Sequence, residues 1–413
     1  MNMNSPRTLL VLLASLNLLN YFDRYVLSSL LEPIKADLHL SDGQLGRVAT
    51  SFMLGYFLTS PFFGYLGDRF PRRYLVFAGA LVWSVATFLT GFAGSLMTLI
   101  LFRVFVGFGE SSFSVVSPAM ISDVYGPARR NNALSFFYTA IPFGAALGFL
   151  FGGVVGSHFG WRDAFFWAGV PGLALASLLF LLPEPRRGGS DNGKGGQPEK
   201  ASLRDLKILL KNPIFLLAVG GYSIYTFAMG AYSYWAPSFL TRTYGLSIQQ
   251  SATFFGAALT VTGVAGTLVG GFTATWLKKR MANGYGLLLG FSMLVAAPLA
   301  LLSHATSSLT VALTAATLCL FALFFSTGPV NTVIIESCPP GMRATAMAIS
   351  VFCIHFFGDL WSPEIVGRLS DYLGDLRWSM LLILPTALLV AAILWLWLAR
   401  KQAAVGAGAT TAA

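Results

Sequence analysis

The chain has 413 residues, of which 55% are hydrophobic and 11% are charged, and its formal net charge is +10. Soluble domains carry about 25% charged residues, so this composition excludes an ordinary water-soluble protein and indicates a chain whose solvent is the lipid bilayer. The basic residues are spread among separate loops rather than gathered in one patch, which argues against nucleic acid as a partner.

Long apolar segments recur from one end of the chain to the other. A helix needs about 20 apolar residues to cross the hydrocarbon core of a bilayer. The first segment follows one early arginine, Arg7, but it is too long and too polar in its middle for a signal peptide, so we interpret it as an uncleaved membrane helix. The pattern predicts twelve membrane-spanning helices, with approximate boundaries 8–34, 44–66, 74–93, 97–121, 132–157, 162–182, 213–240, 250–277, 284–304, 308–336, 344–368 and 378–399.

One long polar insert separates the sixth span from the seventh. Its first part, 186–198, is rich in glycine and charge, which predicts a flexible linker. Its second part, 202–211, has apolar residues at helical spacing with basic residues between them, which predicts a short amphipathic helix on the membrane surface. We therefore expect an N-terminal six-helix bundle at 1–182, a cytoplasmic linker with that helix at 183–212, a C-terminal six-helix bundle at 213–400 and a disordered tail at 401–413.

The lysines and arginines outside the spans are unequally shared between the two sides of the membrane. The side that holds the N-terminus carries 19 of them, and the other side carries six. The positive-inside rule then predicts that both termini are cytoplasmic.

The two halves of the chain repeat each other. The segment 123–133 recurs as 336–346 with the same spacing of its acidic residue, proline and arginine, and the loop 64–73 recurs as 271–280. Parallel repeats of this kind are typical of transporters whose substrate site lies at the repeat interface near mid-membrane.

Two motifs resemble those of major facilitator transporters. The first is the loop between spans two and three, Gly64-x3-Asp68-Arg69-x2-Arg72-Arg73, and the second is the run 103–109 in span four, Arg-x3-Gly-x-Gly. The segment 20–25, Asn-Tyr-Phe-Asp-Arg-Tyr, together with 103–110, is further similar to the Spinster subfamily. Members of that subfamily are lipid transporters that export sphingosine-1-phosphate or lysosomal lysophospholipids in animals, and they also occur in bacteria.

The resemblance implies an all-α membrane protein in which twelve transmembrane helices form two pseudo-symmetric six-helix bundles, the major facilitator fold. It also implies a bacterial member located in the inner (cell) membrane as a multi-pass protein. We expect a monomer.

Charged residues inside two spans point to a pocket. Asp23 and Arg24 lie within span one, where each charge costs at least about 2.5–3.5 kcal/mol unless it is paired or hydrated. In span four, Arg103 and Glu110 belong to one polar stripe at helical spacing. Because the resemblance implies that spans one and four line the cavity, we expect the four residues to share one water-filled pocket.

Roles follow from the chemistry of these groups. We predict that the carboxyl groups of Asp23 and Glu110 are the proton-coupling sites, and that Asn20, Arg24 and Arg103 bind an anionic substrate group. A static pair of salt bridges that fixes the two helices is the alternative. His355 and Asp359 in span eleven, at i and i+4, form a second-choice proton site, and a polar helix contact explains them equally well.

The C-terminal half offers a different wall. Its predicted substrate-binding residues are Tyr222, Tyr225, Phe325 and Asn331, in spans seven and ten. Aromatic stripes also face lipid or neighbouring helices, so that alternative stays open. A charged wall opposite an aromatic, uncharged one favours an amphipathic substrate, with its head toward the arginines and its chain opposite.

The loop after span two predicts a cytoplasmic gate. Its acidic and basic residues can bond helix ends and the facing end of span four when that side is shut. For Arg72 and Arg73, the alternative is that they are ordinary basic residues that anchor the helices on the cytoplasmic side. The second-half loop has Thr275 in place of the acid, so its gate should be weaker. The predicted gate residues are Gly64, Asp68, Arg69, Arg72, Arg73, Asp123 and Arg130.

Glycines occupy every fourth position from 144 to 156 in span five, and 263, 266 and 270 in span eight. Small residues permit close helix approach. The resemblance implies that spans five and eight meet across the two halves.

Together these features predict a secondary active transporter that works by alternating access, is coupled to protons and moves a lysophospholipid or sphingoid-type lipid. Alternatives are a proton-coupled drug exporter or organic-anion symporter on the same fold, and an uncoupled lipid scramblase or membrane receptor. No phosphate loop, nucleophile triad or metal cluster is recognisable, so we expect no enzyme activity, no metal and no cofactor, with the proton gradient as energy source. The expected partners are membrane lipids, the amphipathic substrate and protons.

Overall fold

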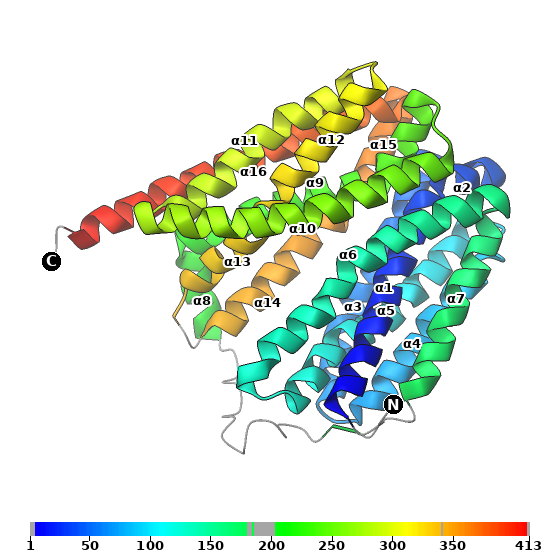
Figure 1. The fold of residues 1–413 in the computed structure, drawn as a ribbon, viewed down its shortest axis with the longest axis horizontal. Helices are drawn as coiled ribbons and strands as arrows, with labels where there is room; N and C mark the ends of the chain where they lie inside the picture. Colours follow the sequence, from blue (N-terminus) through cyan, green and yellow to red (C-terminus); the bar gives the residue numbers. More distant parts are fainter. Residues whose placement is uncertain (1–4, 180–183, 186–202, 340–341, 411–413) are drawn as a thin grey trace. The chain divides into compact units, whose positions relative to one another are not determined.

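The computed structural model describes residues 5–179, 184–185, 203–339 and 342–410. None of these residues lies in a β-strand, and most of them lie in helices (Figure 1). The predicted all-α fold is therefore confirmed. The flexible linker predicted at 186–198 and the end of the predicted tail, 411–413, lie outside the described residues.

The chain folds as two compact units. The first comprises Met1–Pro198 and Ala236–Ala257, and the second comprises Glu199–Trp235 and Ala258–Ala413. Residues 236–257, which join the seventh and eighth predicted spans, therefore pack with the first unit. The sequence prediction assigned all of 213–400 to the C-terminal bundle.

The first unit consists of seven complete helices and the ends of two others. The complete helices are α1 (Pro6–Ser29), α2 (Leu31–Leu38), α3 (Asp42–Gly67), α4 (Arg72–Thr90), α5 (Leu96–Val124), α6 (Pro127–His158) and α7 (Trp161–Leu178). The end of α9 (Pro213–Tyr244) and the start of α10 (Ile248–Arg280) complete it.

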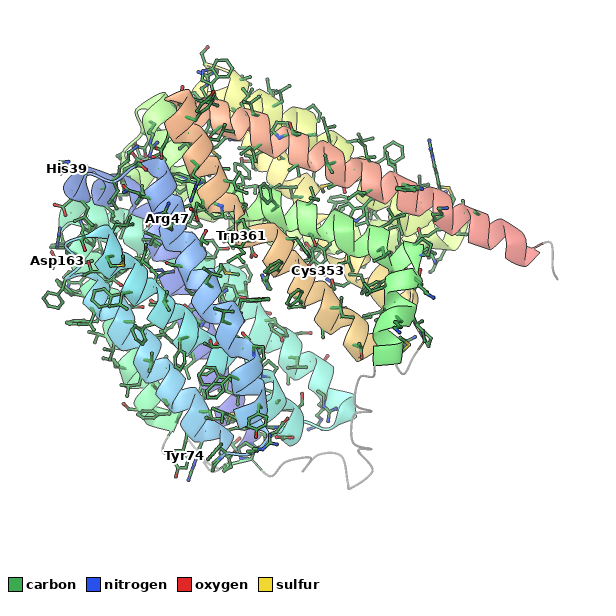
Figure 2. All side chains as sticks on the ribbon, turned by 180° about the vertical axis from the view of Figure 1, so that it is seen from behind. His39, Arg47, Tyr74, Asp163, Cys353 and Trp361 are labelled. Atoms are coloured by element: carbon green, nitrogen blue, oxygen red, sulfur yellow. The ribbon has the colours of Figure 1, made fainter. Side chains whose placement is uncertain are left out.

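These helices pack around one apolar core. α1 packs against α6, α3 against α5, and α4 against both α5 and α7, with Trp83 and Phe113 buried between them. Figure 2 shows Tyr74, at the start of α4, at one end of this unit, and His39 and Asp163, just before α3 and at the start of α7, at the opposite end. α3 and α4 therefore run in opposite directions, as membrane-spanning neighbours must.

The glycine ladder of α6 lies against α1. A β-carbon at Gly148 would lie 2.4 Å from the carbonyl oxygen of Phe22, and one at Gly144 would lie 2.3 Å from that of Leu18. Contact between α6 and the start of α10 is made by other glycines, Gly153 and Gly256, within the first unit. Predicted spans five and eight thus do meet, but through these glycines and not through the ladder, because four-residue spacing shows that a helix is approached closely but not which helix approaches it.

The second unit holds the remaining helices. They are α8 (Leu203–Lys211), most of α9 and α10, α11 (Gly284–Ala305), α12 (Leu309–Phe324), α13 (Thr327–Glu336), α14 (Arg343–Ile354), the π-helical turn η3 (His355–Asp359), α15 (Ser362–Leu373) and α16 (Leu376–Thr410). α8 occupies the stretch where an amphipathic helix was predicted. α16 continues through 401–410, where a disordered tail was predicted, in an alanine-rich segment that favours helix.

Two predicted spans of this unit are broken helices. Span ten is interrupted at Phe325–Ser326, just before Pro329. Proline has no backbone N–H, so it cannot donate the helical hydrogen bond to the preceding turn. Span eleven is interrupted at η3, where Gly358 has a non-helical φ of −101° and ψ of −106°. Cys353 and Trp361 flank this turn on the same run of helix in Figure 2.

Nine helices in the described part of the chain are long and apolar enough to cross a membrane. Each of the twelve predicted intervals overlaps one to three consecutive helical elements, although α1, α3 and α7 are not among the nine. In α1 the polar residues Asn17, Asn20, Asp23 and Arg24 lower the mean hydropathy. A membrane helix with such residues faces a bundle interior rather than lipid. The count of twelve spans stays a prediction.

Candidate functional site

An ion pair joins α1 to α5 inside the first unit. The Nε atom of Arg24 donates a hydrogen bond to the Oε2 atom of Glu110 at 2.6 Å. The Glu110 side chain is fully buried, whereas that of Arg24 is 19% exposed. A charge-assisted bond of this length is among the stronger hydrogen bonds that proteins make. Because its side chain is partly exposed, Arg24 is the partner that a ligand can reach.

Aromatic rings surround the guanidinium group of Arg24. Its Cζ atom lies 4.7 Å from the ring centre of Tyr21 and 5.1 Å from those of Phe52 and Tyr56. Cζ of Arg103 lies 4.8 Å from the ring centre of the same Phe52. These distances are within the range of cation–π attraction. The ring of Phe52 is therefore shared by the two arginines of the predicted pocket.

A glycine of α5 permits this arrangement. A β-carbon at Gly107 would lie 2.1 Å from the carbonyl oxygen of Phe52, so any larger residue would force α3 away from α5. The helix that carries Phe52 can therefore reach the side of α5 on which Arg103 and Glu110 lie two turns apart.

The second carboxyl group, that of Asp23, is buried beside this ion pair. Asp23 is 2% exposed, and Thr87 on α4 donates a long hydrogen bond of 3.4 Å to its Oδ2 atom. Arg103, itself 2% exposed, attracts both Asp23 and Glu110 electrostatically. The buried amide of Asn20 lies beside Glu110 and also favours its negative charge. All five residues predicted for the N-terminal side of the site thus lie together.

The chemistry of this cluster follows from its burial. Two carboxyl groups and two guanidinium groups lie where an ion without a partner is very costly. Glu110 is paired with Arg24, but among the described residues the Oδ1 atom of Asp23 and the Oε1 atom of Glu110 accept no hydrogen bond. A carboxylate that loses its arginine in such a place becomes stable only by taking up a proton.

Comparison with known proteins identifies the family. The Major Facilitator Superfamily model matches residues 13–363. Protein spinster homolog 3 of Danio rerio is 33% identical over 383 residues, which cover 88% of this chain and 76% of the relative. The sphingosine-1-phosphate transporter SPNS2 of the same species is 32% identical over 381 residues, covering 87% and 75%. The chain belongs to the Spinster family of the Major Facilitator Superfamily.

Solved structures agree on the fold. A crystal structure titled as a bacterial homologue of the human lysosomal transporter Spinster, inward-facing and unoccupied, matches with a TM-score of 0.84 over 96% of both chains, at 24% identity. A D-xylose–proton symporter matches with a TM-score of 0.74 over 95% of this chain and 97% of its own, at 20% identity. The protein is thus a multi-pass membrane transporter with the major facilitator fold.

In this Spinster-family chain, the loop predicted as a gate is organised by Arg72. Its Nη1 atom forms an ion pair with Oδ2 of Asp123 at the end of α5, and both side chains are 12% exposed. Its Nη2 atom is 3.9 Å from Asp68, which is 77% exposed and therefore a weak partner. Glu184, from beyond α7, accepts hydrogen bonds from the backbone N–H groups of Arg72 and Arg73 at 2.7 and 3.0 Å, which caps the start of α4.

The other predicted gate residues make local contacts. Cζ of Arg69 lies 3.5 Å from the ring centre of Tyr65, and Arg130 donates to two carbonyl oxygens at the end of α5 at 3.1 and 3.3 Å. A β-carbon at Gly64 would lie 3.8 Å from Val115, an ordinary contact. Packing in this unit therefore does not require a glycine at position 64.

The second unit has an ion pair in a similar place, although Lys278 is not the repeat position of Arg72. Lys278 at the end of α10 and Glu336 at the end of α13 approach to 3.4 Å, with side chains 37% and 48% exposed. Exposed ion pairs contribute little because water screens them. That the second-half loop forms a weaker gate stays a prediction.

Five predicted residues of the second unit also lie together. The hydroxyl of Tyr222 is within hydrogen-bond reach of Asn331, and Asp359 acts on it electrostatically. The Nδ1 atom of His355 is 3.0 Å from Oδ1 of Asp359. The ring of Tyr225 lies 5.9 Å from that of Tyr222. The predicted aromatic wall and the second-choice proton site therefore form one cluster on α9, α13 and η3.

Phe325 does not belong to this cluster. Its ring packs on that of Phe321 at 5.1 Å, and both line a groove against α11. Tyr225 is itself buried, and its other neighbouring ring is that of Trp395 on α16, at 6.1 Å. Within the second unit, Tyr222 and Asn331 are therefore better placed than Tyr225 or Phe325 to meet a ligand.

Sequence reasoning missed one charged cluster at the far side of the first unit. Arg242 binds both carboxylate oxygens of Asp42 at 2.6 and 2.8 Å and Oε1 of Glu32 at 2.9 Å, and Lys35 reaches Asp42 at 2.6 Å. The available signal was the spacing of four charged residues within 32–42, next to the end of span one, of which Glu32, Lys35 and Asp42 belong to the cluster. Their partner, 200 residues further along the chain, could not be read from that spacing.

Proposed function

We propose that this protein is a secondary active transporter that moves an amphipathic lipid of the lysophospholipid or sphingoid type by alternating access, coupled to protons. The observation that carries the proposal is the Arg24–Glu110 pair, in which a reachable arginine is bonded to a buried carboxylate. The names of its relatives, which include a sphingosine-1-phosphate transporter, support the substrate class.

The coupling step follows from competition for one arginine. An anionic head group that binds Arg24 displaces Glu110, which is then buried without its cation. Burial of an unpaired carboxylate is unfavourable, so Glu110 takes up a proton as the head group binds. Substrate and proton therefore bind together, and Arg103 holds the remaining negative charge of Asp23.

The aromatic surround suits an amphipathic ligand. The rings of Tyr21, Phe52 and Tyr56 offer an apolar surface beside the charged head-group site. In the second unit, Tyr222 and Asn331 supply aromatic and amide groups but no charge.

A second carboxyl group is a candidate for the same role. Asp359 pairs with His355 at the π-helical turn, and π-turns in helices are frequent at functional sites. We propose the His355–Asp359 pair as the second-choice protonation site, after Asp23 and Glu110.

We also propose that the protein lies in the bacterial inner membrane as a monomer with both termini in the cytoplasm. The side of the membrane that holds the N-terminus carries 19 basic residues and the other side carries six, which supports this orientation.

Transport by purified protein in liposomes tests the proposal. We expect an imposed pH gradient to drive movement of a labelled lysophospholipid, with little movement of a cationic dye or a small organic anion. Lysophospholipid movement that ignores the gradient would favour a scramblase, movement of the dye would favour a drug exporter, and movement of anions alone would favour an organic-anion symporter.

A further inference from the structure

The second unit carries an apolar groove on helices that cross the membrane. It lies between α11 and α12 and has a volume of about 780 Å³. α11 and the run from α12 to α13 are among the most apolar spans of the chain. Exposed side chains line the groove, including Phe291, Val295 and Leu318, each about half exposed. The groove therefore opens toward hydrocarbon.

The chemistry of the walls selects the occupant. Ser292 is the one polar residue among those that line the groove, and its hydroxyl is already hydrogen-bonded to Ser326 at 3.0 Å. Pro298 lies inside α11, and an interior proline bends a helix. A groove of this kind can hold a hydrocarbon chain but offers nothing to a polar head group.

Basic residues lie next to one end of the same groove. α10 ends with Lys278, Lys279 and Arg280, and its last turn contacts the start of α11 at Gly284. Leu288, the first lining residue, follows one turn later. Lys279 and Arg280 are both exposed.

The side chains at this end have the character of a membrane interface. Cζ of Arg280 lies 4.0 Å from the ring centre of Trp276, and Nζ of Lys278 lies 5.0 Å from that of Tyr285. Aromatic residues of this kind gather at the level of the lipid head groups, and basic residues there attract anionic ones.

We infer that this groove is a binding site for an anionic glycerophospholipid of the surrounding bilayer. One acyl chain lies between α11 and α12, and the phosphate lies at Lys279 and Arg280. The groove spans 288–302 on α11, about 21 Å of helix, which is sufficient for most of a chain. The inference does not rest on the proposed transport cycle.

A bound chain would stabilise a joint of the second unit. Phe321 and Phe325 line the groove, and their backbone atoms contact α10 at Gly266 and Gly270. Phe325 is also the residue at which α12 ends before α13 begins. A lipid chain in the groove would therefore stabilise the break between α12 and α13, the helix that carries Asn331.

Photo-crosslinking of the full-length protein in lipid nanodiscs tests the inference. The probe is a phosphatidylglycerol with a photoreactive group midway along one acyl chain, and the labelled peptides are identified by mass spectrometry. We expect labels in 284–305 and 309–325, and we expect unlabelled phosphatidylglycerol to compete better than phosphatidylcholine. Labels elsewhere, or equal competition by the two lipids, would overturn the assignment.

Two matched pairs of variants sharpen the test. Val295→Trp fills the groove and should lower labelling at least about tenfold, equivalent to about 1.4 kcal/mol, whereas Ile393→Trp, on the exposed face of α16, should not. Lys279→Gln should lower labelling about fivefold, because it removes one basic residue from the end of α10 that contacts α11 next to the groove. Lys207→Gln should not, because α8 packs against α14 and does not line the groove.

Thermal unfolding provides the second measurement. Phosphatidylglycerol should raise the Tm of the wild type and of Ile393→Trp more than that of Val295→Trp, because a ligand stabilises the state that binds it. An equal rise in all three proteins would contradict the groove site. Crosslinking of two protein chains through 284–325 would show that a second copy, and not lipid, covers it.

Discussion

Replacing Arg24 by alanine should destabilise the first unit, because the change leaves a buried carboxylate without its cation. Removing one partner of a buried ion pair typically costs about 3–5 kcal/mol. Glu110 is fully buried and its bond to Arg24 is 2.6 Å long, but the arginine side chain is 19% exposed. Water can therefore replace part of the interaction, and we expect the lower end, about 3 kcal/mol.

A double-mutant cycle separates the charge from the packing. Arg24→Ala with Glu110→Gln removes both charges, so it should recover most of the loss, with a coupling energy of about 2–3 kcal/mol. The Tm of each purified variant is measured at neutral and at acidic pH, with Arg69→Ala, an exposed arginine, as the control. The loss in Arg24→Ala should shrink in acid, where Glu110 takes up a proton.

The result that would refute this reasoning is equally definite. If Arg24→Ala is as stable as Arg69→Ala, Glu110 does not depend on its arginine. If the double variant is no more stable than Arg24→Ala, the arginine acts through packing against its aromatic neighbours, and the ion pair has no part in coupling.

Three further changes probe other parts of the molecule. Arg72→Gln removes the ion pair to Asp123 and should cost about 2–3 kcal/mol in thermal unfolding, with slower transport in liposomes; unchanged values for both would remove this pair from the gate. Gly148→Ala should cost about 1–3 kcal/mol, since its β-carbon would lie 2.4 Å from a carbonyl oxygen of α1, and an unchanged Tm would show that the two helices separate easily. A hydrogen bond from Arg162 holds the pKa of Asp37 below its ordinary value of 3.8, so this pair stabilises the fold above that pH and ceases to do so as the pH falls through the lowered pKa. The Tm of Asp37→Asn should therefore approach that of the wild type in strong acid, and a difference that persists there would contradict the assignment.

The residues of the charged site could be predicted because charges inside membrane helices are costly. Asp23, Arg24, Arg103 and Glu110 stand out in apolar segments, and helical spacing assigns the last two to one face. Their partners among neutral residues could not be predicted in this way. Thr87 is an ordinary polar residue in its span, and only packing brings it to Asp23.

Contacts between residues far apart in the sequence could not be predicted either. Glu184 caps a helix that begins 112 residues earlier, and its own neighbourhood in the sequence gives no sign of this. The glycine ladder of α6 was recognised, but its partner α1 was not, since close approach depends on the order in which helices pack. The break in span ten lies just before Gly328–Pro329, as the missing N–H of proline requires.

Proton exchange on ligand binding tests the central claim most directly. Purified protein in weakly buffered detergent is titrated with a lysophospholipid that carries a phosphate group, and the pH change is recorded with an indicator dye. The account predicts uptake of about one proton per bound lipid by the wild type, and binding without uptake by Glu110→Gln. Binding without proton exchange by the wild type, or undiminished uptake by Glu110→Gln, would contradict it.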